Sequence, residues 1–115
     1  MSCKILLMTV RLAGTAALLL IAAYFLGAPV PLAAHTGAGG VTVLALWALA
    51  AQARRTAGRL SAVGALLGLL LPVLGMAQIH LAASPWDIVV RAAHVLTAIA
   101  VLGVAERIGR SLKSR

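Results

Sequence analysis

Two histidines, His35 and His94, have the residue type and spacing in this chain that most readily support chemistry. Each follows two alanines near the start of a long apolar stretch, and 59 residues separate them (94 − 35). A neutral imidazole nitrogen is a good ligand for iron and other transition metals. If the two stretches form parallel helices at a similar depth, the two rings can face each other across one metal ion.

Other kinds of reactive site have little support. The chain has two carboxylates, Asp87 and Glu106, and they lie at opposite ends of the last apolar stretch, which argues against paired acid–base catalysis. No serine or cysteine has a histidine–carboxylate pair within evident reach. A metal site without a further cofactor would have to recruit His80 and would still be a meagre set of ligands. We therefore expect no catalytic residues.

The composition predicts that lipid surrounds the two histidines. Hydrophobic residues make up 63% of the 115 residues, charged residues only 10%, and the mean hydropathy is +1.07. A soluble domain of this length cannot bury so much apolar surface. Four stretches have about the 20 residues that a helix needs to cross the hydrocarbon core. We predict an all-α, polytopic membrane protein, a single four-transmembrane-helix domain over 1–115, with helices at 5–27, 33–52, 60–79 and 87–105.

The net charge of +8 is a topology signal rather than a sign of nucleic-acid binding. Basic residues gather near both chain ends and in the connection between the second and third stretches, whereas only Arg91 lies near the opposite connections. The positive-inside rule then places both termini in the cytoplasm, and we expect a multi-pass protein of a bacterial-type inner membrane. The basic residues on the predicted cytoplasmic side are Lys4, Arg11, Arg54, Arg55, Arg59, Arg107, Arg110, Lys113 and Arg115.

An internal match suggests that the bundle consists of two repeated helical hairpins, 5–53 and 59–106. An offset of 48 residues aligns 11–27 with 59–75, with an arginine identity at the first position and a glycine identity at the last. The histidines align at an offset of 59, so eleven residues are expected as an insertion in the second outer connection. A parallel repeat about an axis along the membrane normal would bring His35 opposite His94.

The neighbours of the histidines favour one cofactor, a haem b held by both axial bonds. On the helix face that carries His35, the side chains that follow are small as far as Thr42 and Ala45, so a flat macrocycle can approach the helix there. The bulkier Leu46 and Leu49 then close that face. Arg91 is the expected counter-ion for the haem propionates, with Gln78 and His80 as hydrogen-bonding partners. The alternative for Arg91 is an interfacial anchor paired with Asp87, and for His80 an exposed loop position.

This pattern resembles one half of a haem A synthase, in which two four-helix halves are fused and each can hold a haem between two histidines. The resemblance implies axial roles for His35 and His94. The substrate-oxidising half of that family has a glutamate one turn before the histidine of its second helix, and Leu32 stands there in this chain. The resemblance therefore implies the haem b-binding half, without haem-oxidising activity of its own. Small bis-histidine membrane cytochromes of the b type share the same local chemistry.

The leading hypothesis is a membrane cytochrome b with one haem between the second and fourth helices near the outer face. It would transfer electrons, or bear haem as a subunit of a respiratory or haem-biosynthesis assembly, as a homo-oligomer or within a larger membrane complex. The alternative is a cofactor-free structural or assembly subunit. A transporter remains a third interpretation, but small four-helix exporters resemble the chain only in size, because the first apolar stretch has no carboxylate.

Overall fold

Four helices account for most of the computed structural model, which describes residues 2–113. They are α1 (Cys3–Phe25), α2 (Leu32–Ala53), α3 (Gly58–His80) and α4 (Asp87–Lys113). Each is long and apolar enough to cross a membrane, which confirms the prediction of four apolar helices. Arg115, one of the basic residues placed on the cytoplasmic side by the charge pattern, lies outside the described residues.

Local chemistry explains where the helices begin and end. The Ser2 hydroxyl caps α1 by accepting a hydrogen bond from the Ile5 amide at 3.3 Å. Gly27 follows α1 with φ +91°, a conformation that favours glycine, and Pro31 then occupies the N-cap position of α2. Asp87 lies in the first turn of α4, where its charge complements the helix dipole.

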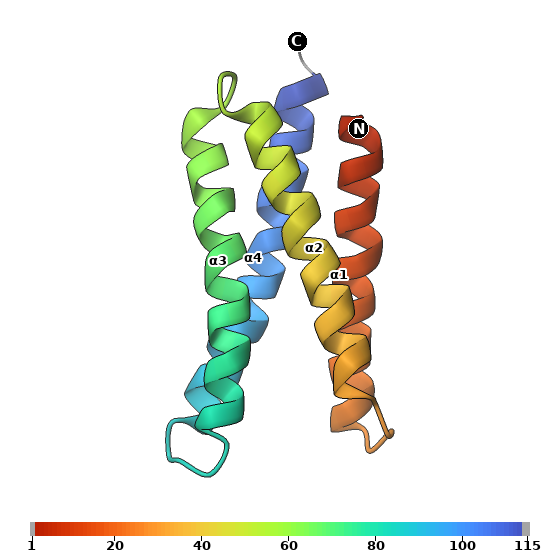
Figure 1. The fold of residues 1–115 in the computed structure, drawn as a ribbon, viewed down its shortest axis with the longest axis vertical. Helices are drawn as coiled ribbons and strands as arrows, with labels where there is room; N and C mark the ends of the chain where they lie inside the picture. The colour runs from red at the N-terminus through yellow and green to blue at the C-terminus, as the bar shows by residue number, and fades with distance from the viewer. Residues whose placement is uncertain (1, 114–115) are drawn as a thin grey trace.

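The helices run alternately up and down, so both chain ends and the α2–α3 connection lie at one end of the bundle (Figure 1). The connections 26–31 and 81–86 lie at the other end. Helices α2 and α4 each contact all three other helices, whereas α1 and α3 do not contact each other within the described residues. The two helices that carry the histidines therefore form the central pair of the bundle.

The tightest packing lies in the half of the bundle that holds the chain ends. The largest fully buried side chains come from α1, α2 and α4, and they include Leu46 and Leu49, the two residues expected to close the His35 face. Towards the other end α2 and α3 separate (Figure 1). The half of the bundle next to the connections 26–31 and 81–86 is more open than this buried layer, whose members are Val10, Leu46, Leu49, Val101 and Ile108.

The helix bounds repeat at an offset of 55 residues rather than 48. The outer connections 26–31 and 81–86 are equally long, so the eleven extra residues do not lie in the second connection as predicted. When the 48-residue offset is applied, α3 ends seven residues after the position that matches the end of α1. The other four residues lie in α4, where seven residues precede His94, whereas three residues precede His35 in α2. Leucine and alanine matches are common in apolar helices, so they do not determine register. The equivalent bounds are Cys3 with Gly58, Phe25 with His80, and Leu32 with Asp87.

An ion pair joins α1 to α4 near the chain ends. The Arg11 guanidinium donates to both carboxylate oxygens of Glu106, with Nη2 2.8 Å from Oε2. Arg11, one of the basic residues of the charge pattern, therefore has a carboxylate partner on α4. Pairing lowers the free-energy cost of a charge near the hydrocarbon, because each ion replaces part of the hydration that the other loses.

Trp47 of α2 packs closely against Gly68 of α3. A Cβ atom on Gly68 would lie 2.9 Å from Cδ1 of the Trp47 indole, and the indole Nε1 donates to the Ala65 carbonyl at 3.2 Å. One turn earlier, a Cβ on Gly64 would lie 3.2 Å from Cδ1 of Ile108. Gly64 and Gly68, four residues apart on α3, therefore both lie at close helix contacts.

Gly68→Ala is expected to lower the free energy of unfolding by about 1–3 kcal/mol, the usual cost of overpacking, because the new methyl group displaces the Trp47 indole. In a Trp47→Ala background the same change should cost much less. Unfolding titrations of the four proteins in detergent give the coupling energy as a double-mutant cycle. Gly103→Ala is the matched control, since nothing lies within 4 Å of its Cβ position. An equal cost of Gly68→Ala in both backgrounds would contradict the steric explanation.

Candidate functional site

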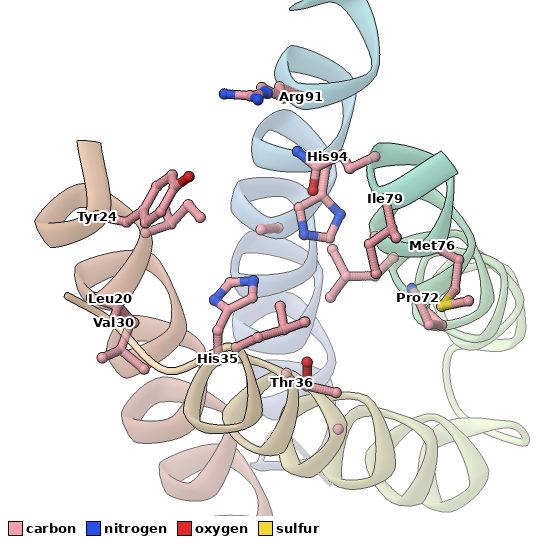
Figure 2. Close-up of a pocket in the computed structure, with 18 of the residues that line it drawn as sticks. Leu20, Tyr24, Val30, His35, Thr36, Pro72, Met76, Ile79, Arg91 and His94 are labelled. Atoms are coloured by element: carbon pink, nitrogen blue, oxygen red, sulfur yellow. The ribbon is translucent and has the colours of Figure 1, made fainter. Parts of the chain in front are cut away.

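The half of the bundle next to the connections 26–31 and 81–86 contains a cavity of about 770 Å³ that all four helices line. This volume falls within the range of about 300–1,000 Å³ that is typical of small-molecule sites. Its walls are mostly apolar, and a few polar side chains point into it (Figure 2). The polar lining residues are Tyr24, His35, Thr36, Gln78, Arg91 and His94.

The two histidines meet across this cavity. His35 comes from the first turns of α2 and His94 from the first half of α4, and their rings face each other (Figure 2). The ring centres are 6.2 Å apart and the ring planes are inclined by 62°. The fold thus brings together two residues that are 59 positions apart in the sequence.

The backbone of α1 fixes the tautomer of His35. Its Nδ1 atom lies 3.1 Å from the carbonyl oxygen of Ala17. Because a carbonyl oxygen only accepts, Nδ1 must carry the proton, and the lone pair is then on Nε2. Metal-binding histidines commonly donate their second ring nitrogen to a backbone carbonyl in this way. His35 is therefore oriented as a ligand through Nε2.

His94 lies against α3 and is not satisfied in the same way. Its Nδ1 atom is buried and makes no hydrogen bond to the residues that the structure describes. Gly75 makes room for the ring, since a Cβ there would already be 3.4 Å from Cε1 of His94. A buried polar atom without a partner costs free energy, so an occupant of the cavity that bonded to this ring would offset that cost.

The spacing of the rings fits two ligands on opposite sides of one metal ion. A metal–imidazole bond is about 2 Å long and the ring centre lies about 1 Å behind the nitrogen, so the two ring centres should be about 6 Å apart. The observed distance is 6.2 Å. Within residues 2–113, no group of three or more histidine, cysteine, aspartate or glutamate side chains is placed to hold a metal ion. The protein therefore offers an ion two ligands at this site.

Charged and polar groups line the cavity near the connection 81–86. Arg91 lines it one turn before His94, and its Nε and Nη2 atoms donate to the two carboxylate oxygens of Asp87, each at 3.0 Å. Arg91 is therefore paired with Asp87, and its guanidinium still borders the cavity. The pairing with Asp87 and the expected role as a counter-ion for propionates are thus compatible. Gln78 also lines it, whereas His80 is exposed at the end of α3 and is not among the lining residues.

Part of the site has no signal in the sequence. The carbonyl of Ala17 belongs to the backbone, so no residue type could have indicated it. Tyr24 borders the cavity from the last turn of α1, and only its place beside the outer connection could have suggested this. Leu32, one turn before His35, lines the wall as an apolar residue.

Comparisons with protein-family models, with curated proteins and with solved structures give no match to this chain. The geometry of the cavity is therefore the basis for interpreting its function.

Proposed function

We propose that the chain is a membrane cytochrome b that holds one haem b between α2 and α4, with His35 and His94 as the axial ligands. The observation that carries the proposal is the pair of imidazoles whose centres are 6.2 Å apart inside an apolar cavity of about 770 Å³. When bound, the haem supplies one-electron redox chemistry. The site would serve electron transfer, or the chain would be a haem-bearing subunit of a respiratory or haem-biosynthesis assembly.

A haem suits this site better than a bare metal ion. The macrocycle brings four nitrogen ligands of its own, so the protein needs to supply only two. A structural zinc site takes four protein ligands and a catalytic one takes three. His35 and His94 provide two, and the described residues place no third candidate ligand beside them.

The surrounding residues have distinct roles in this proposal. The Ala17 carbonyl holds His35 in the tautomer that presents Nε2, and Gly75 gives the His94 ring its space. Arg91, held by Asp87, provides positive charge for the propionate carboxylates, with Gln78 as a hydrogen-bonding neighbour. The mostly apolar walls suit the apolar body of the macrocycle.

The proposal includes insertion into a bacterial-type inner membrane with both termini in the cytoplasm. Its support is the charge pattern: the described basic residues, apart from Arg91 and the paired Arg11, gather at the bundle end that holds the chain ends and the α2–α3 connection. The cavity then lies in the outer half of the bilayer. Leu32 provides no carboxylate beside His35, so we do not propose haem oxidation by this chain alone.

The visible absorption spectrum of the protein, purified in detergent after expression with ample haem, tests the proposal. We expect a low-spin spectrum in the oxidised protein and a sharpened α-band on reduction, because both axial positions are filled by imidazole. A featureless spectrum from folded, helical protein would overturn the proposal and favour the cofactor-free structural or assembly subunit.

A further inference from the structure

A second hollow lies between α2 and α3, at the opposite end of these helices from the histidine cavity. It is a groove of about 560 Å³ that runs from mid-helix to the connection between the two helices. Small side chains form much of its wall, and one charged residue, Arg54, lies at its end. The lining residues are Trp47, Ala50, Ala51, Arg54, Ser61, Ala65, Leu66 and Leu69.

The polar groups inside the groove are already occupied. The Ser61 hydroxyl donates to the Ala50 carbonyl at 2.5 Å, and the Trp47 indole donates to the Ala65 carbonyl at 3.2 Å. The rest of the wall is alanine and leucine, so it offers an occupant apolar contact alone. A hydrocarbon chain is the kind of molecule that such a wall accommodates.

The mouth of the groove is strongly basic and has no acidic neighbour to neutralise it. Arg54 lines the groove; Arg55 follows it in the α2–α3 connection and Arg59 lies in the first turn of α3, both exposed. The two acidic side chains of the sequence are engaged elsewhere, Asp87 with Arg91 and Glu106 with Arg11. A guanidinium that is free of carboxylates matches the geometry and charge of a phosphate group.

From this juxtaposition we propose that the α2–α3 groove binds an anionic phospholipid. One acyl chain lies along the wall between Trp47 and Leu69, and the phosphate lies beside Arg54. Apolar grooves that end in basic residues at the headgroup level are typical sites for anionic lipids. The site is separate from the histidine cavity, and the proposal does not depend on whether haem binds there.

Native mass spectrometry of the full chain, released from micelles that contain equal amounts of phosphatidylglycerol and phosphatidylcholine, tests this site. We expect one phosphatidylglycerol to be retained in preference to phosphatidylcholine. Arg54→Gln should weaken its retention about fivefold, the factor expected for one basic residue at an anionic surface. Arg107→Gln is the matched control, because Arg107 is exposed at the same end but does not line the groove.

A second variant tests the acyl-chain part of the site. Ala51→Phe places a ring in the groove and should reduce retention of phosphatidylglycerol, whereas Ala16→Phe, an exposed position on α1 outside the groove, should not. Equal retention of the two lipids, or equal effects of Arg54→Gln and Arg107→Gln, would overturn the proposal. A second copy of the chain found in the groove, seen as a dimer that Ala51→Phe dissociates, would also overturn it.

Discussion

His35→Ala and His94→Ala are each expected to abolish the low-spin haem spectrum. The two rings are the pair of imidazoles that borders the cavity, and their centres are separated by the distance that one metal ion between them requires. Within the described residues no third metal-binding side chain is grouped with them, so neither ligand has a substitute. The loss should therefore be complete in each single variant rather than partial.

Oxidised and reduced absorption spectra measure this loss, and far-UV circular dichroism with size-exclusion chromatography shows that the variants remain folded. His80→Ala is the control, because His80 is exposed and outside the cavity lining, and it should keep the wild-type spectrum. Free imidazole should restore the low-spin signal of either alanine variant by filling the vacated space. An intact low-spin spectrum in His35→Ala would show that the haem ligands are elsewhere.

The sequence was sufficient to predict the elements and the meeting of the two histidines. Apolar stretches of sufficient length predict the helices, and each histidine follows a similar Ala-Ala pair near the start of the second helix of a hairpin. The spacing of Leu46 and Leu49 along α2 also identified the buried face. These features follow from hydropathy and helical periodicity, which are properties of a single segment.

Features that depend on how two segments fit together could not be predicted. The hairpin register was wrong by seven residues in the first helix pair, because leucine and alanine identities do not fix the vertical position of one helix against another. The Arg11–Glu106 pair joins residues 95 positions apart, and the Trp47 indole rests on the bare backbone of Gly68. Each depends on the shape of a neighbouring helix rather than on a local pattern.

Gly39→Phe is expected to prevent haem binding while leaving the fold and both histidines intact. Gly39 lines the cavity one turn after His35, and nothing lies within 4 Å of the position of a Cβ atom there. An aromatic side chain at this position would extend into the cavity rather than into a neighbouring helix. Because glycine is unfavourable within a helix by about 0.5–1 kcal/mol, the variant should be at least as stable as the parent towards unfolding.

Haem titration of the detergent-purified protein, together with unfolding titrations, tests this prediction. Gly103→Phe is the matched control, because Gly103 also has nothing within 4 Å of its Cβ position but does not line the cavity. It should bind haem as the parent does. Since Gly39→Phe retains both histidines, its loss of haem would localise the macrocycle to the space between α2 and α4, which the histidine variants alone do not establish. An unchanged low-spin spectrum in Gly39→Phe would place the haem outside this cavity and require other axial ligands.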